Sequence, residues 1–172
     1  MLIETWLGDI TKLEVDAIVN AANERLAPGG GVCGAIHAAA GPELAVECAR
    51  VGPCPTGDAK ATAGYGLTGR WVIHAVGPRW DTGGDEKVEL LASAYRRALE
   101  LADEMGARSI AFPSISTGIF GFPQPLASQT AVAALRSLEP VSLQRCVLVA
   151  YDQGTLAVLD EALAAPTEPP AV

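Results

Sequence analysis

The sequence predicts an α/β fold in which helices cover both faces of a largely parallel sheet. Short β-type runs alternate with helical patterns along the chain, which is the order that such a fold requires. The length of 172 residues suits one domain. A hydrophobic share of 49% against 19% charged residues is typical of a globular protein with a substantial core.

Strands dominate the first half of the chain. Residues 34–50 carry apolar side chains at helical spacing and predict one helix. The turn at residues 66–69 begins and ends with glycine and separates two of the expected strands. The strands are expected at residues 3–7, 16–21, 59–65 and 71–76.

The second half continues the alternation. A long amphipathic pattern over residues 85–105 predicts a helix closed by Gly106, since glycine commonly follows the last helical residue. The remaining strands are expected at residues 109–112 and 146–151, and the remaining helices at residues 124–138 and 155–164. Residues 165–172 are proline-rich and expected to form a mobile tail, which leaves residues 1–164 as the domain.

Charge and composition exclude several classes of partner. With 12 Lys and Arg against 20 Asp and Glu, the net charge of −8 argues against nucleic-acid or membrane binding through a basic surface. No run approaches the roughly 18 apolar residues of a membrane span, and the first residues lack a basic signal region, so we expect a cytoplasmic protein. No CxxC or metal-finger spacing is present, so we expect free thiols and no metal at the cysteines, which are Cys33, Cys48, Cys54 and Cys146.

Three loops that directly follow expected strands carry the residues of chemical interest. They span residues 8–11, 20–34 and 114–122, and the last two lead into helices. Ligands of parallel α/β sheets collect at the carboxyl ends of the strands. Glycine runs before a helix let backbone amides bind phosphate without Lys or Arg, although glycine also makes ordinary turns. Two such loops at one edge of the sheet suit a diphosphate.

Two nucleotide-binding motifs fail in their context. Gly29, Gly31 and Gly34 satisfy the dinucleotide fingerprint, but that motif needs an acidic residue after a strand about 20 residues further on. Residues 52–56 contain neither a strand nor an acid, which disfavours a hydride-transfer enzyme. The Walker A pattern fails as well, because Asp58 follows where lysine is required.

The ordered set of motifs resembles the macrodomain family, and within it the MacroD-type branch of ADP-ribose hydrolases. The resemblance spans residues 3–163 and is carried by residues 8–11, 16–23, 29–42, 54–57, 72–78 and 111–121. It implies a three-layer α/β/α sandwich with a six-stranded mixed sheet and an ADP-ribose cleft across the strand ends. It also implies that no metal or redox cofactor is needed.

The resemblance assigns the polar residues of the three loops. Asp9 would accept a hydrogen bond from the adenine 6-amino group beside the Ile10 amide, although an aspartate here is also a common turn or helix cap. Asn20 and Asn23 would hold the distal ribose hydroxyls, although asparagine at a strand end is often a turn former. Tyr151, followed by Asp152, would line the adenine side.

The glycine-rich loops would hold the diphosphate and the distal ribose. Phe120 would pack against that ribose, and its alternative role is a partly buried anchor of the loop. The residues implied by the resemblance are Gly29, Gly30, Gly31 and Val32 in one loop and Ser116, Thr117, Gly118, Ile119 and Phe120 in the other.

Cys33 departs from the pattern of the hydrolytic branch. The members with activity carry an aspartate there, which positions or activates the attacking water, and a thiol is a poorer base. Cys33 next to a helix start, with His37 one turn later, could form a nucleophilic dyad. Alternatively Cys33 only fills a small space. Asn20 would still support a route in which the substrate's diphosphate holds the water, and His74 in an apolar strand is expected to be a hydrogen-bonded core residue.

The resemblance implies two functions of different class. The first is hydrolysis of ADP-ribosyl esters, namely mono-ADP-ribosylated Asp or Glu on proteins and O-acetyl-ADP-ribose. The second is a non-catalytic reader of ADP-ribose, because the expected aspartate is Cys33. Either way we expect a monomer whose partners are ADP-ribose, ADP-ribosylated proteins or O-acetyl-ADP-ribose, with no cofactor, membrane or sequence-specific nucleic acid.

Overall fold

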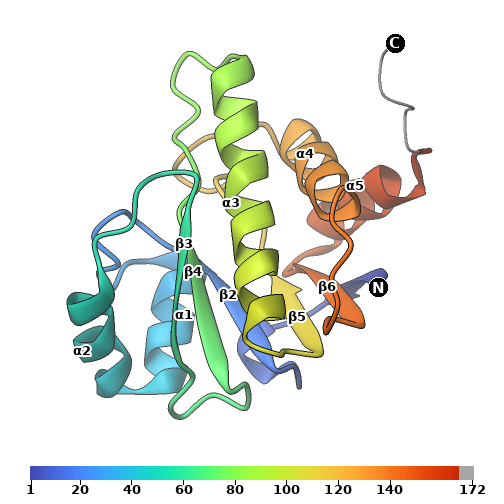
Figure 1. Ribbon diagram of the computed structural model, residues 1–172. Coiled ribbons are helices and arrows are strands. Elements are labelled where there is room, and N and C mark those ends of the chain that lie inside the picture. The colour runs from blue at the N-terminus through green and yellow to red at the C-terminus, as the bar shows by residue number, and fades with distance from the viewer. Residues whose placement is uncertain (167–172) are drawn as a thin grey trace.

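A single sheet organises residues 1–166, the part of the chain that the computed structural model describes (Figure 1). It has six strands in the order β1-β6-β5-β2-β4-β3. The strands are β1 (Leu2–Leu7), β2 (Ala17–Ala21), β3 (Ala59–Ala63), β4 (Trp71–Ala75), β5 (Ser109–Phe112) and β6 (Arg145–Ala150). The six strands expected from the sequence are confirmed.

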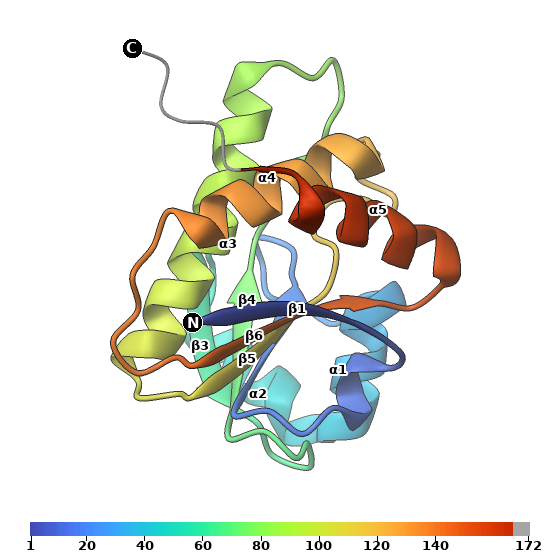
Figure 2. The ribbon, with the colours of Figure 1, turned by 90° about the vertical axis from the view of Figure 1, so that its right-hand side faces the viewer.

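The sheet is mixed but largely parallel, as predicted. Strand β1 pairs with β6, β6 with β5, β5 with β2 and β2 with β4, all in parallel, and only the edge strand β3 runs antiparallel to its neighbour among the described strands. The carboxyl ends of the parallel strands therefore meet at one edge. Figure 2 shows β1 and β6 running side by side toward that edge.

Helices cover both faces of the sheet and complete the three layers (Figure 2). One face packs against η1, α1 and α2, and the other against α3, α4 and α5. The helices are η1 (Ile10–Lys12), α1 (Gly31–Ala40), α2 (Pro42–Val51), α3 (Asp85–Glu104), α4 (Gln124–Arg136) and α5 (Gln153–Ala164).

Each buried strand supplies both cores because its side chains alternate between the faces. In β2, Ala17 and Val19 join the core under α3 to α5, whereas Ile18 joins the core under α1 and α2. All three side chains have no exposed surface. This explains why residues 17–19 form an uninterrupted apolar run and do not alternate with polar side chains.

The prediction of one helix over residues 34–50 is wrong, because the chain forms two helices there. The first helix begins at Gly31 and ends at Ala40, and α2 begins at Pro42. Gly41 between them has a φ of 93°, which favours glycine, and it donates its N–H to the carbonyl of His37. Pro42 then starts α2 at a position where its missing N–H is not needed.

The ends of the later helices are closer to expectation. Met105 caps α3, and Gly106 follows with a φ of 83° and donates its N–H to the Asp103 carbonyl, as predicted for a helix terminator. Helix α5 ends at Ala164. The sequence predicts a mobile tail over residues 165–172, of which residues 167–172 lie outside the described residues.

Candidate functional site

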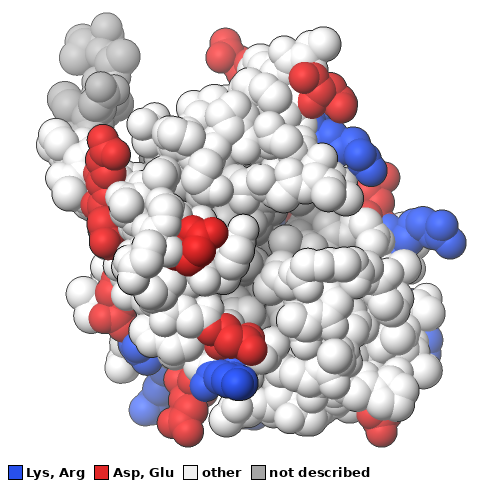
Figure 3. Space-filling view, turned by 180° about the vertical axis from the view of Figure 1, so that it is seen from behind, with Lys and Arg blue, Asp and Glu red and all other residues white. Residues whose placement is uncertain are grey.

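The loops singled out in the sequence all leave the sheet at the carboxyl edge of its parallel strands. Gly8 follows β1, residues 22–30 follow β2, and residues 113–123 follow β5. Figure 3 views this edge, since β1 and β6 point to the right of Figure 2 and thus to the back of Figure 1. The face is hollowed near its centre, and the hollow is lined mainly by uncharged atoms.

Asp9 is the cap of η1, as the alternative role from the sequence suggests. Its Oδ1 accepts hydrogen bonds from Thr11 N at 2.9 Å and from Thr11 Oγ1 at 2.7 Å, and these lower the pKa of the carboxyl group. Within residues 1–166, Oδ2 has no hydrogen-bond partner, so the exposed carboxylate keeps one oxygen available to a ligand. Ile10 beside it is buried in the core.

Asn20 lies near the carboxyl end of β2 and is only 1% exposed. It is in register with His74 on the neighbouring strand β4. Its Nδ2 lies 3.1 Å from His74 Nδ1 and donates to Cys33 Sγ at 3.6 Å. Its Oδ1 is buried and has no hydrogen-bond partner among the described residues. Such an acceptor is costly unless something pairs with it.

His74 is the hydrogen-bonded core histidine that the sequence predicts. It has no exposed surface, and its Nε2 lies 2.9 Å from Thr62 Oγ1 and 3.6 Å from Cys48 Sγ. Burial lowers the pKa of the imidazole to about 4, with a smaller contribution from the nearby His37. At neutral pH the ring is uncharged and can orient Asn20 but adds no charge to the site.

Asn23 serves the loop itself. Its Nδ2 donates to the Ala27 carbonyl at 3.0 Å, and its Oδ1 accepts from Ala27 N at the same distance. The side chain thus closes a turn, the alternative that the sequence left open for it. One N–H of its amide group remains for a ribose hydroxyl.

Cys33 and His37 do not form the dyad considered from their spacing. The Cys33 thiol donates to the Ala27 carbonyl at 3.8 Å and accepts from Asn20. Both ring nitrogens of His37 are buried and lack a hydrogen-bond partner in residues 1–166, and burial lowers the pKa of this ring. Although the residues lie one turn apart on α1, their polar groups do not meet.

The glycine-rich loop brings free backbone amides to the start of α1. Gly30 is the N-cap residue and Gly31 has a φ of 58°. The N–H groups of residues 31–33 precede the first intrahelical bond, which runs from Gly34 to the Gly30 carbonyl at 3.3 Å. A Cβ on Gly30 or Gly31 would meet nothing within 4 Å, so a ligand can approach this backbone closely.

The second loop, residues 116–120, is held close to the segment after β4. Ser116 has a φ of 68°, and its Oγ is buried without a hydrogen-bond partner among the described residues. A Cβ on Gly77 would lie 2.2 Å from that oxygen, so glycine is required there. Trp80 N donates to the Phe120 carbonyl at 2.8 Å.

Phe120 is partly buried, and the guanidinium of Arg79 lies 4.5 Å from the centre of its ring. Ile119 beside it is 94% exposed. Thr117 and Gly118 complete the loop, and Gly121 donates its N–H to the Gly118 carbonyl at 3.0 Å. The aromatic ring is therefore fixed at the rim of the site by a contact that sequence reasoning missed. In the sequence, the signal for a turn that could bring Arg79 to the site is Gly77-Pro78, directly after the strand expected at residues 71–76.

Tyr151 lies next to the Asp9 loop, because Gly8 N donates to the Ala150 carbonyl at 2.8 Å. Its side chain is 83% exposed. Asp152 caps α5 by accepting from Thr155 N at 2.7 Å, which lowers the pKa of its carboxyl group. The position of Tyr151 is compatible with the adenine side, while Asp152 has a structural role.

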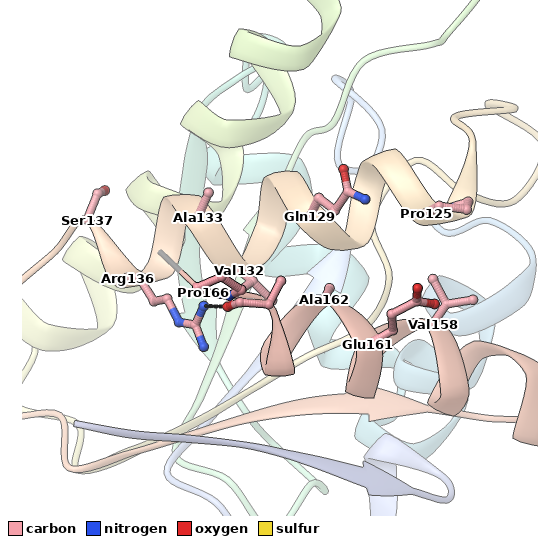
Figure 4. A pocket seen from close by; sticks show the side chains of 11 residues that line it. Pro125, Gln129, Val132, Ala133, Arg136, Ser137, Val158, Glu161, Ala162 and Pro166 are labelled. Carbon is pink, nitrogen blue, oxygen red and sulfur yellow. Dashed lines mark hydrogen bonds between the residues drawn. The ribbon is translucent and has the colours of Figure 1, made fainter. Parts of the chain in front are cut away.

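A separate groove lies between α4 and α5 and shares no residue with these loops (Figure 4). Its walls are largely apolar and include Val132, Val158 and Ala162, and Arg136 at one end donates to the Ala165 carbonyl at 3.1 Å. Arg136 and Glu161 are the charged residues among those that line it.

Residues 1–166 contain no group of three or more His, Cys, Asp or Glu side chains placed to hold a metal ion. The four cysteines are free and buried. Over the same described range, every helix is too short or too polar to cross a membrane. The polar groups gathered at the strand ends are amides, hydroxyls, the Cys33 thiol and the exposed carboxylates of Asp9 and Asp152.

The sequence profile of the Macro domain family matches residues 19–131. A macro domain-containing protein of Chlorobaculum tepidum is 48% identical over 167 residues, which cover 96% of this chain and 97% of that protein.

Solved structures of similar fold extend the comparison. A variant of the Oceanobacillus iheyensis macrodomain with ADPR has 40% identity and a TM-score of 0.86, covering 94% of this chain and 90% of that one. The Trypanosoma brucei macrodomain in complex with ADP-ribose has 38% identity and a TM-score of 0.87, covering 94% of this chain and 69% of that one.

Proposed function

The chain belongs to the macrodomain family, and from this premise we propose that it binds ADP-ribose in the hollow at the carboxyl edge of its sheet. The observation that carries the proposal is Asn20 Oδ1, a buried acceptor with no partner in residues 1–166, beside the free amides at the start of α1. Relatives of known structure were obtained with ADPR and with ADP-ribose. A ligand hydroxyl would supply the partner that the protein does not.

Each part of the ligand has a matching group along this edge. Asp9 Oδ2 would accept from the adenine amino group, with Tyr151 on the same side. The amides at the start of α1 and in residues 116–120 would bind the diphosphate, because helix N-termini attract anions without a charged side chain. Asn20 and the Phe120 ring would hold the distal ribose.

Calorimetric titration with ADP-ribose tests the proposal. We expect saturable binding by the native chain and binding about two- to tenfold weaker in Asn20→Ala, the loss typical of one hydrogen bond. A matched control is Thr130→Val, which alters a buried threonine on α4 that donates to the Leu126 carbonyl. It should bind like the native chain. Absence of binding by folded native protein would overturn the proposal.

Hydrolysis of ADP-ribosyl esters is a second candidate, for mono-ADP-ribosylated Asp or Glu and for O-acetyl-ADP-ribose. It is favoured by Asn20 and residues 116–120, which would hold the distal ribose while the diphosphate holds a water. Cys33 limits this route, because its thiol donates to Ala27 and has no basic side chain within hydrogen-bond distance in the described residues. We therefore propose a binding protein with slow ester hydrolysis.

Replacing Cys33 tests whether its thiol is what slows ester hydrolysis. We expect Cys33→Asp to release ADP-ribose from a glutamate-linked substrate faster by about 10²–10⁴-fold, the usual contribution of a positioned base. Release is followed by chromatography at saturating substrate, and Cys33→Ala serves as the size control. Equal rates for the native chain and Cys33→Asp would contradict the assignment. Loss of turnover in Cys33→Ala with intact ADP-ribose binding would show that the thiol itself takes part.

A further inference from the structure

The amide of Asn20 is held by groups from two different elements. His74 Nδ1 on β4 and Cys33 Sγ on α1 both lie within hydrogen-bond distance of Nδ2, at 3.1 and 3.6 Å. An amide nitrogen has two N–H groups and no acceptor capacity. Both neighbours therefore occupy the donor end of the amide, and Oδ1 is left as its unpaired end.

His74 can act as the acceptor only if its proton is on Nε2. That nitrogen lies 2.9 Å from Thr62 Oγ1, whose own hydroxyl donates to the Ala63 carbonyl at 3.2 Å. The donors and acceptors in these bonds agree, because His74 Nε2–H can donate to Thr62 Oγ1 while the Thr62 hydroxyl donates to the Ala63 carbonyl. Thr62 is 3% exposed and His74 is fully buried, so water does not compete for these bonds.

We propose that His74 is a positioning residue for ligand binding, whose Nδ1 lone pair turns the Asn20 amide so that Oδ1 accepts a hydroxyl of the distal ribose. The inference rests on the proposed binding of ADP-ribose. Thr62 fixes the tautomer, and Cys33 holds the second N–H of the amide. None of the His74 atoms touches the ligand.

The distal ribose provides a readout that a purely structural role would not change. ADP carries the adenosine and the diphosphate but lacks the distal ribose, so it does not reach Asn20. Disturbing the fold weakens ADP and ADP-ribose together, whereas turning the Asn20 amide weakens only ADP-ribose. The measured quantity is the ratio of the two affinities, obtained by calorimetry for each variant.

Two amide replacements separate the roles of the ring nitrogens. In His74→Asn the amide oxygen can take the place of Nδ1 and keep Asn20 oriented, whereas His74→Gln can replace only Nε2. We expect His74→Gln to lower the ADP-ribose to ADP affinity ratio about two- to tenfold and His74→Asn to retain it. Thr62→Val should lower the ratio as well, while Thr130→Val, a buried threonine on α4, should not.

A double variant links the effect to Asn20. In an Asn20→Ala background, His74→Gln should leave the affinity ratio unchanged, because the group that it positions is gone. Equal losses with and without Asn20 would overturn the inference. So would an unchanged ratio in His74→Gln. If the folded native chain binds neither ligand, the proposed function fails as well. That result differs from the one in which both ligands bind and the ratio of their affinities does not respond to His74→Gln.

The tautomer can be observed directly by nitrogen NMR of the imidazole rings. The chain has two histidines, so His74→Asn assigns the signals. We expect the proton on Nε2 of His74 at neutral pH. A proton on Nδ1 would overturn the inference, because Asn20 would then have to turn its oxygen toward His74 and its N–H groups toward the ligand.

Discussion

At the scale of single residues, the site depends on side chains whose hydrogen bonds are already used within the protein. Cys33 holds the Ala27 carbonyl and the Asn20 amide, and Asn23 closes a turn with both of its polar atoms. Asn20 Oδ1 and Ser116 Oγ are buried without partners among residues 1–166. These two oxygens are the groups that a bound ligand would satisfy, because burial makes an unpaired acceptor or hydroxyl costly.

His74 also makes folding stability depend on pH. Burial lowers its folded pKa to about 4 from the ordinary 6.5, so the unfolded chain takes up a proton at a higher pH than the folded chain does. Stability therefore falls as the pH drops from 6.5 toward 4, by up to about 3 kcal/mol, and this contribution levels off below the folded pKa.

Urea unfolding between pH 7.5 and 4.5 measures this dependence. We expect His74→Asn to have a flatter profile than the native chain, because asparagine does not titrate. His37 is the reference for a second histidine whose pKa is lowered by burial, and His37→Asn should keep most of the native slope. Parallel profiles for the native chain and His74→Asn would show that His74 is not the titrating group.

At the scale of elements, Gly41 sets the break at which α1 ends and α2 begins. Gly41 has a φ of 93° and a ψ of 175°, a conformation that is almost restricted to glycine. A Cβ there would also lie 3.2 Å from Glu43 Oε2. The glycine thus allows two helices where the apolar spacing alone predicts one.

We expect Gly41→Ala to destabilise the fold by about 1–3 kcal/mol, the usual cost of a non-glycine residue in this region. Gly154→Ala is the matched control, because Gly154 lies in the first turn of α5 and its Cβ would make only an ordinary contact with Asp152 at 3.5 Å. That variant should be neutral or more stable by up to about 1 kcal/mol. Equal midpoints of urea unfolding for both variants would contradict the argument.

At the scale of the whole molecule, the layers could be predicted but several contacts of the site could not. The alternation of strand-like and helical patterns predicts the six strands and the edge of the sheet at which the loops lie, because both depend on local patterns in the sequence. The pairing of Asn20 with His74 joins positions 54 residues apart and becomes visible only when β2 lies beside β4. The spacing of Cys33 and His37 suggested a pair because it is local, yet Cys33 binds groups outside its helix.

The charge of the whole molecule gives a last prediction about how the ligand is held. The chain carries a net charge of −8, and the diphosphate is proposed to bind neutral backbone amides at the start of α1. Sites that hold phosphate through Lys and Arg lose affinity as salt rises, since screening weakens each ion pair. Here screening instead reduces the repulsion between an acidic protein and an anionic ligand.

We therefore expect the ADP-ribose affinity to stay within about twofold, or to rise, between roughly 50 and 500 mM NaCl. Calorimetry at several salt concentrations measures it. Arg79, whose guanidinium lies over the Phe120 ring, is the cation to control for, and Arg79→Ala should show the same flat response. A steep loss of affinity with salt in both proteins would mean that other charged side chains, not backbone amides, hold the diphosphate. A loss that disappears in Arg79→Ala would assign that role to Arg79.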